Sequence, residues 1–260
     1  MTHDASTAPS DGVRDRHQQL AADLRALIQD GDLPPGTQLP TTDQLMRQYG
    51  VTNQTVQRAL RVLKAEGYVE GQAGRGVFVR GTQAVVVKAD AFLNPTAPGE
   101  PYAWIAAAAA RGQVGTTELL DVRERSAPFR VAAAFGLSTG DPVVVRKQLL
   151  LLDGQPAELV SNHYPLDIAR GTPLELRKKI KGGSPTLLDS LGFRPAHAVD
   201  HVLPRLATVE EFIALQLPED VPVLRQFRVV YSDDDRPVEA SVLVKAGQRY
   251  EVEYELKPLR

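Results

Sequence analysis

The sequence predicts an α+β protein with two domains, a small helical domain that ends in a β-hairpin and a larger domain built on an antiparallel sheet. Its 260 residues are enough for two hydrophobic cores. Apolar residues recur at helical spacing in the first part of the chain, whereas runs typical of strands dominate beyond about residue 115. Asp153-Gly154 lies between two apolar runs, as the turn of a β-hairpin does.

The composition limits the possible functions. The chain is 43% hydrophobic, contains no cysteine and has a formal net charge of −2, which is typical of a soluble globular protein. The absence of cysteine excludes a disulfide framework, thiol catalysis and Cys-ligated zinc. Apolar runs are too short for a membrane span, and the N-terminus lacks the layout of a signal peptide. We therefore expect a cytoplasmic protein with no membrane partner.

The chain should begin with a tail and a first helix. Residues 1–12 are small and polar, so we expect them to be disordered. From Val13 the sequence reads as a helix that ends at Gly31. Its apolar face, which should pack on the next helices, is made of Leu20, Leu24, Leu27 and Ile28.

Residues 39–80 predict two helices and a hairpin. Thr41 and Gln44 have the spacing of a capping box, so a helix should begin there and end at Gly50. Thr52 is the expected N-cap of the second helix. The apolar stripe of that helix consists of Val56, Ala59, Leu60 and Leu63. The strands Tyr68–Glu70 and Val77–Val79 follow, so residues 13–80 form a predicted winged helix-turn-helix, a shape that lays one helix in the DNA major groove.

Polar side chains of this segment could contact DNA. Asn and Gln can pair with adenine and Arg with guanine, Thr near a helix N-terminus can donate to phosphate, and Arg at a hairpin tip can enter the minor groove. Residues 47–80 also carry six Lys and Arg against two Glu, a local cationic excess suited to phosphate. The alternatives are a solvated polar face or a protein contact. The candidate DNA-binding residues are Thr41, Thr42, Thr52, Asn53, Gln54, Thr55, Gln57, Arg58, Arg61 and Arg75.

These residues resemble the N-terminal domain of GntR-family bacterial transcription regulators. The matching positions are Gly31, Leu33-Pro34-Pro35-Gly36, Leu39-Pro40, Gly50-Val51-Thr52, Thr55-Val56, Ala59-Leu60, Leu63, Glu66-Gly67 and Gly74-Arg75-Gly76-Val77-Phe78-Val79. The resemblance implies binding to a double-stranded DNA operator. The family often has Arg where this chain has Asp43, Asn53 and Gln57, which suggests more amide-to-adenine readout here.

Residues 81–100 contain Asn94-Pro95 and Pro98-Gly99, which predict a linker between the domains, although Val85–Val87 has the composition of a strand. A short Ala-rich helix should follow over Tyr102–Ala110. The second domain then spans residues 101–260. Its expected strands are Glu118–Arg125, Pro142–Asp153, Gln155–Tyr164, Ala198–Pro204, Pro222–Ser232, Pro237–Lys245 and Arg249–Leu256. Its expected short helices are Ala127–Phe135, Leu166–Arg170, Pro185–Leu191 and Thr208–Leu215.

This half of the chain is similar to the UTRA domain of the HutC subgroup of GntR regulators, whose fold is like that of chorismate lyase. The matching residues are Ala132, Leu137-Ser138-Thr139-Gly140-Asp141, Val145-Arg146, Asp153-Gly154-Gln155-Pro156, Glu158, Ser161-Asn162-His163-Tyr164-Pro165, Leu187-Leu188, Val221-Pro222-Val223-Leu224, Pro237-Val238-Glu239-Ala240-Ser241 and Arg249-Tyr250. The resemblance implies a small-molecule effector pocket lined by Arg146, Glu158, Ser161, Tyr164, Glu239, Arg249 and Tyr250. The alternative is structural, with core tyrosines and an ion pair across the sheet. The strand Gln148–Leu152 lacks the extra Arg of members that bind phosphorylated sugars, which makes such a ligand less expected.

A basic loop suggests one further binding site. Four cations in residues 177–181 stand beside Gly182-Gly183, and Ser184 should cap a helix that begins with Pro185. Free N–H groups at such a turn can bind an anion, so Lys181 and Ser184 are candidate contacts to an anionic effector. The alternative is a solvated basic loop. His197 and His201 lack a third convergent ligand, so we expect no metal site.

Together these observations predict a regulator, most simply a repressor, whose operator affinity is controlled by an effector. We expect a homodimer, no cofactor and no catalytic residues. The alternatives are an enzyme of the chorismate-lyase-like fold and a repressor that needs no effector.

Overall fold

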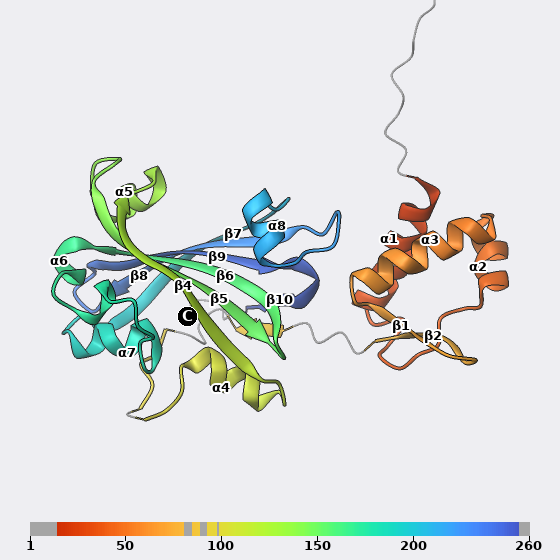
Figure 1. Ribbon diagram of the computed structural model, residues 1–260, viewed down its shortest axis with the longest axis horizontal. Coiled ribbons are helices and arrows are strands. Elements are labelled where there is room, and N and C mark those ends of the chain that lie inside the picture. Colours follow the sequence, from red (N-terminus) through yellow and green to blue (C-terminus); the bar gives the residue numbers. More distant parts are fainter. Residues whose placement is uncertain (1–14, 81–84, 89–92, 98, 255–260) are drawn as a thin grey trace, which may run out of the picture. The chain divides into compact units, whose positions relative to one another are not determined.

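The structure is a computed structural model that describes residues 15–80, 85–88, 93–97 and 99–254 (Figure 1). The chain divides into two compact units after Gln83. The expected tail over residues 1–12 lies outside the described residues, as do residues 13 and 14 of the expected first helix. No described helix is long and apolar enough to cross a membrane.

The first unit contains three helices and a two-stranded antiparallel hairpin, which confirms the predicted winged helix-turn-helix fold. Its elements are α1 (Arg16–Gln29), α2 (Thr42–Tyr49), α3 (Asn53–Ala65), β1 (Val69–Gln72) and β2 (Gly76–Val79). The predicted capping box is present, since the Thr41 hydroxyl accepts from the Gln44 amide and the Gln44 side chain accepts from the Thr41 amide. Gly50 ends α2 with a φ of 62°, in the left-handed region that glycine adopts without strain.

One hydrophobic core holds this unit together. The apolar stripe of α3 is buried against Leu20 and Leu24 of α1 and Leu45 of α2. Arg25 of α1 also makes a bidentate ion pair with the buried Glu66, with N–O distances of 2.8 and 2.6 Å. The core packs against the apolar side of α3, and the ion pair holds its C-terminal end. The polar side of α3 therefore faces outward.

The second unit is built on one six-stranded antiparallel sheet, which confirms the predicted α+β class. Its strand order is β4-β5-β6-β9-β8-β7. In chain order the elements are β3 (Val85–Lys88), α4 (Ala103–Ala110), β4 (Gly115–Ser126), α5 (Phe129–Phe135), β5 (Pro142–Leu152), β6 (Gln155–Pro165), α6 (Leu166–Ala169), η1 (Pro173–Glu175), α7 (Gly183–Ser190), β7 (Pro195–Arg205), α8 (Val209–Ala214), β8 (Val223–Ser232), β9 (Pro237–Ala246), η2 (Gly247–Arg249) and β10 (Tyr250–Glu253).

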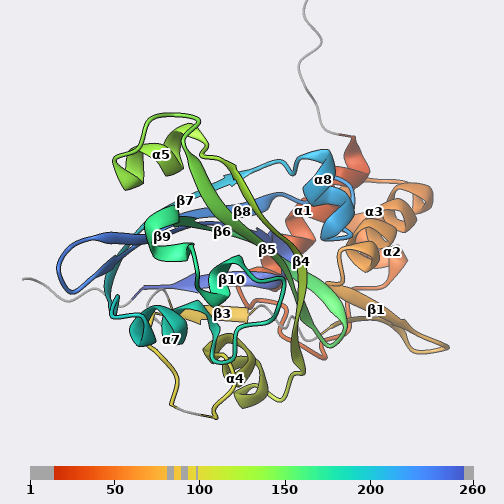
Figure 2. The ribbon, with the colours of Figure 1, turned by 60° about the vertical axis from the view of Figure 1, so that its left-hand side comes forward.

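The two faces of this sheet are covered by different elements (Figures 1 and 2). Helices α5 and α8 lie over one face, where Phe227 and Val244 point. Helices α4 and α7, together with the β3–β10 ribbon, lie over the other face, where Leu150 and Val230 point. Since side chains alternate along a strand, every second residue of the central strands points toward α4 and α7.

The expected linker over residues 81–100 is largely part of the second unit. Strand β3 pairs in parallel with β10, with Val85 opposite Tyr250. The backbone N–H of Thr96 donates to the Thr186 hydroxyl at 2.9 Å. The strand composition noted for Val85–Val87 therefore corresponds to β3, whereas its pairing with a strand at the far end of the chain was not evident from local composition.

Candidate nucleic-acid interface and buried cavity

Helix α3 presents a polar face to solvent. Its buried side consists of Val56, Ala59, Leu60 and Leu63, and the candidates Asn53, Gln54, Gln57, Arg58 and Arg61 are all exposed. The Thr52 hydroxyl accepts from the Thr55 amide at 3.3 Å and so caps the helix. A helix held by its apolar side, with amides and guanidinium groups directed outward, can enter a major groove.

Helix α2 contacts this polar face at one point. The Gln57 side chain donates to the Thr42 hydroxyl at 3.3 Å, and the Arg61 guanidinium donates to the Gln57 carbonyl at 3.4 Å. These contacts orient Gln57 beside the N-terminus of α2, where the exposed Thr41 is also found. Amide and hydroxyl groups from both helices therefore form one continuous surface.

The turn between β1 and β2 carries Arg75, which is exposed. Its guanidinium lies 5.4 Å from the centroid of the Phe78 ring, and its carbonyl accepts from the Gln38 side chain at 2.7 Å. Gly76 has a φ of 115°, a conformation that L side chains rarely adopt, so the turn needs glycine there. The structure thus holds the backbone of Arg75 while leaving its side chain on the surface. All ten DNA-binding candidates are exposed or half-exposed.

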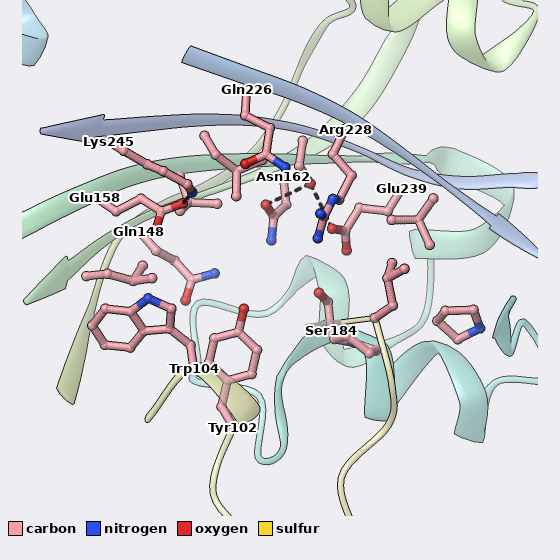
Figure 3. A pocket seen from close by; sticks show the side chains of 18 of the residues that line it. Tyr102, Trp104, Gln148, Glu158, Asn162, Ser184, Gln226, Arg228, Glu239 and Lys245 are labelled. Atoms are coloured by element: carbon pink, nitrogen blue, oxygen red, sulfur yellow. Dashed lines mark hydrogen bonds and ion pairs between the residues drawn. The ribbon is translucent and has the colours of Figure 1, made fainter. Parts of the chain in front are cut away.

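A cavity lies in the second unit, between the sheet and the elements that cover it (Figure 3). The space open to the centre of a water molecule is about 60 Å³, which is room for a few waters, since one water needs about 10–15 Å³ on this measure. The cover includes Leu93, Tyr102 and Trp104. The polar side chains on the sheet side come from four strands and are Gln148, Glu158, Asn162, Gln226, Arg228, Glu239, Ser241 and Lys245.

Charged groups of the cavity are buried and paired. Lys245 donates to Glu158, and both residues are 2% exposed. Arg228 makes a bidentate ion pair with Asp200 at 2.8 and 2.7 Å. Burial lowers the pKa of Arg228, but the hydrogen bond and charge of Asp200 outweigh it, so the net shift is upward. Both basic side chains are thus paired with carboxylates inside the protein.

Glu239 has a different environment. One of its carboxylate oxygens accepts from the Tyr164 hydroxyl at 2.9 Å, and the other accepts from the Ser241 hydroxyl at 2.7 Å. Ser241 also contacts the Asn162 side-chain oxygen at 3.0 Å. Burial, and then the Glu239 carboxylate, raises the pKa of Tyr164 well above its ordinary value, so this tyrosine remains a neutral donor.

An open groove of about 670 Å³ adjoins the cavity and shares Tyr102, Gln148, Asn162 and Ser184 with it. Burial and the nearby Glu158 and Glu239 carboxylates raise the pKa of Tyr102, which stays protonated. A Cβ at Gly183 would lie 2.4 Å from Cδ2 of the Tyr102 ring. The ring therefore packs directly on Gly183 of the 182–183 turn and lines both the cavity and the groove.

The effector-binding candidates fall into three groups. Glu158, Glu239 and Ser184 line the cavity. Tyr164, Arg146 and Lys181 line the groove, as Ser184 also does. The candidates that line neither space are Ser161, Arg249 and Tyr250. The structure therefore brings together only part of the predicted set.

Two of these departures have a clear geometric reason. Glu158, Val160 and Asn162 of β6 line the cavity, so the alternation of side chains directs Ser161 to the opposite face. Tyr250 is buried among Trp104 and other apolar side chains, with Nζ of Lys245 at 5.2 Å from its ring centroid. The Tyr250 ring thus packs against Lys245, which lines the cavity, but does not line the cavity itself.

Arg146 is 2% exposed and holds a loop. Its guanidinium donates to the carbonyl oxygens of Pro173, Leu174, Leu176 and Lys178 at 3.3, 2.8, 2.8 and 2.6 Å. Burial lowers its pKa from the usual value. These four contacts occupy both terminal nitrogens, which points to a structural role beside the groove.

The basic loop also differs from expectation. Helix α7 begins at Gly183 with Gly182 as its N-cap, so Ser184 is not the cap. Gly182 has a φ of 75°, in the left-handed region that glycine adopts without strain. Lys181 is exposed at the rim of the groove. The two histidines lie on the edge strand β7, and the His197 ring stacks on Tyr231 at a centroid distance of 4.7 Å.

Several cavity residues had no place among the sequence candidates. They are Tyr102, Trp104, Gln148, Asn162, Gln226, Arg228, Ser241 and Lys245. Arg228 and Lys245 each interrupt a largely apolar strand, and a charged residue in such a position needs a buried partner. That signal was present in the sequence, but it does not identify the partner.

His163 gives the second unit a testable pH dependence. It is 5% exposed, and burial lowers its pKa below the ordinary value. Below the unfolded pKa of about 6.5, the unfolded chain binds a proton at this histidine more readily than the folded protein does. The stability that is present above that pKa is therefore lost as the pH falls toward the pKa of His163 in the folded protein. We expect the free energy of unfolding to decrease over that interval, and His163→Gln to remove this part of the decrease. Urea unfolding at several pH values measures it.

His201→Gln is the matched control, since it makes the same chemical change at an exposed position of β7. The fluorescence of Trp104, the only tryptophan in the sequence, reports on the second unit. If the free energy of unfolding decreases equally with falling pH in the wild type and in His163→Gln below the ordinary histidine pKa of about 6.5, this decrease does not come from His163.

Comparison with known proteins agrees with both units. Residues 16–79 match the model for bacterial regulatory proteins of the gntR family, and residues 110–251 match the UTRA domain. The chain is 28% identical over 248 residues to an HTH-type transcriptional regulator of Streptomyces coelicolor, covering 92% of each chain. It is 26% identical over 238 residues to the HTH-type transcriptional repressor NagR of Bacillus subtilis, covering 90% of this chain and 91% of that protein.

A crystal structure of a GntR-family transcriptional regulator superposes with a TM-score of 0.58 at 26% identity, covering 95% of this chain and 99% of that one. The sequence motifs, the two folds and these matches agree. The chain belongs to the GntR family of bacterial transcription regulators, in the HutC-type arrangement of a helix-turn-helix domain followed by a UTRA domain.

Proposed function

We propose that this DNA-binding regulator is a repressor whose affinity for its operator is controlled by a small molecule bound in the cavity of the second unit. The observation that carries the proposal is the burial of polar groups around that cavity. Gln226, Arg228 and Glu239 are each 7% exposed and line it together. Burial of a polar group costs free energy unless the group is hydrogen-bonded or paired, and a concave site lined by several converging polar groups is typical of a ligand pocket. The similarity to the repressor NagR supports repression rather than activation.

The DNA side of the proposal rests on α3. Asn53 and Gln57 read bases in the major groove, while Arg58 and Arg61 contact phosphates. Thr52 and Thr55 at the N-terminus of the helix add donors where backbone N–H groups also point outward. A homodimer in the cytoplasm would present this surface twice, to operator half-sites about one helical turn apart or a multiple of it.

Communication between effector and DNA would pass through the cover of the cavity. Leu93, Tyr102 and Trp104 line the cavity and belong to the stretch that follows β3, the first strand after the helix-turn-helix unit. An effector that contacts these side chains changes the position of the chain segment next to the connection between units. Because the coupling is reciprocal, an effector that binds the DNA-free protein more tightly also weakens DNA binding.

Selection of bound sequences from random duplex DNA tests the first part. We expect a two-fold symmetric site and an affinity that decreases steeply with salt, as phosphate contacts require. A metabolite screen for release of that site then tests the second part. Failure to enrich any sequence would contradict DNA recognition, and release by no metabolite would contradict effector control.

Gln57→Ala and Arg75→Ala should have different effects on the selected site. Loss of the Gln57 amide should lower discrimination at one base position by about 1–3 kcal/mol, or roughly 5- to 150-fold in affinity ratio. Arg75→Ala should instead weaken binding to all sequences and reduce the salt slope by about 1. Binding titrations on the selected site and its single-base variants measure both. Unchanged base discrimination in Gln57→Ala would remove this residue from readout.

A further inference from the structure

The cations that line the cavity are already engaged by carboxylates of the protein. Lys245 is paired with Glu158, and Arg228 makes a bidentate contact with Asp200. An anionic ligand would have to draw one of these cations away from its partner. That would leave a buried carboxylate without its counter-charge, which is strongly unfavourable.

The charged groups that line the cavity in the described part of the chain, counted together with Asp200 as the ion-pair partner of Arg228, are three carboxylates and two cations. Among the described residues, the hydrogen-bond donors to Glu239 are the neutral hydroxyls of Tyr164 and Ser241. Glu158 and Asp200 balance the two cations, so the Glu239 carboxylate remains in excess. The nearby charge of Glu239 raises the pKa of Arg228. The bidentate hydrogen bonds of the Arg228 guanidinium, however, go to Asp200. A ligand of zero or positive charge suits this balance.

Further polar groups are available to such a ligand. Within the part of the chain that the structure describes, the Gln148 and Gln226 side chains make no hydrogen bond, although both line the cavity. Each amide can both donate to and accept from a hydroxyl group. Trp104 and Tyr102 form the opposite wall (Figure 3). Aromatic faces attract ammonium groups and pack against C–H surfaces.

We propose that the effector of this protein is a small ligand rich in hydrogen-bond donors with zero or positive net charge, whose hydroxyl or ammonium group donates to Glu239. This inference rests on the proposed role of the cavity as the effector site. It deepens that role, because it excludes phosphorylated and carboxylated metabolites from the cavity. The exposed Lys181 lies on the rim of the adjoining groove, so an anion bound there is an outcome that the experiment must distinguish.

Thermal unfolding of the full chain in the presence of small metabolites tests the proposal. The library contains matched sets on one small carbon skeleton, such as glycerol, 2-aminopropane-1,3-diol, glycerate and glycerol 3-phosphate, together with other small polyols, amines, amino acids and organic acids. We expect the compound with the largest upward shift in unfolding temperature to be neutral or cationic. Calorimetric titration of that compound should then give an affinity about 10-fold weaker or more for Glu239→Gln, the loss expected for a charge-assisted hydrogen bond.

Glu118→Gln is the matched control, since it makes the same chemical change at an exposed position of β4, and its affinity should equal that of the wild type. Glu239→Gln can keep one acceptor for Tyr164 or Ser241, and its unfolding temperature without ligand verifies that it folds. A stronger shift with an anionic compound, or an equal affinity for Glu239→Gln, would overturn the inference. A library without any stabilising compound would do so as well.

These outcomes are separable from failure of the proposed function. An anion that binds and releases the selected DNA would leave effector control intact and refute the charge class. Lys181→Glu would then lower its affinity if it binds in the groove. A neutral compound that binds without changing DNA affinity would support the charge class and refute effector control.

Discussion

Lys245→Met is expected to lower the free energy of unfolding of the second unit by about 3–5 kcal/mol. Lys245 and Glu158 are both 2% exposed and lie opposite each other on β9 and β6. Methionine fills a similar volume but leaves the Glu158 carboxylate buried without a counter-charge. Urea unfolding of the full chain, followed by Trp104 fluorescence, measures the change, because Trp104 and Glu158 line the same cavity.

The double variant Glu158→Gln with Lys245→Met should recover most of this loss, since removal of both charges from a buried site is often close to neutral. A second control is the exposed pair Arg170–Glu124, whose side chains are 62% and 48% exposed. Its removal should cost at most about 1 kcal/mol. Equal effects of the buried and exposed pairs would show that Glu158 is hydrated or neutral without Lys245.

The helix-turn-helix could be predicted almost completely from sequence because its information is local. The capping box at Thr41, the cap at Thr52 and the apolar stripe of α3 each involve residues within two helical turns, and all are present in the structure. The large sheet was predictable for a similar reason, since alternation and turn residues mark each strand. Strand β3 was less predictable because its partner β10 is at the other end of the sequence.

The cavity shows where sequence information ends. Glu158 and Glu239 were nominated by resemblance and line the cavity. Ser161 was nominated by the same resemblance, but the alternation of side chains along β6 directs it to the other face. Arg228 faces Asp200 only because β7 and β8 pair in this register. The register of the strands, and the face of the sheet to which each residue points, depend on contacts between distant strands. Residue types alone therefore could not identify the cavity residues.

Arg146→Met should lower the free energy of unfolding by roughly 3 kcal/mol, because it removes a buried guanidinium that donates to four carbonyl oxygens. The affected loop, residues 173–178, leads into the turn on which Tyr102 packs. We therefore also expect faster amide hydrogen exchange in this loop. Arg146→Lys should recover only part of the stability, because a single ammonium group cannot reach carbonyls arranged as a fork.

This prediction separates the structural role of Arg146 from the effector-binding role that the family resemblance implies. Arg170→Met, at an exposed position, is the matched control and should change stability by no more than about 0.5 kcal/mol. If Arg146 holds the loop, its replacement changes unfolding and hydrogen exchange even without a ligand. If it instead binds the effector directly, Arg146→Met will leave both unchanged and reduce only ligand affinity. The buried position of the side chain and its four carbonyl partners favour the first result.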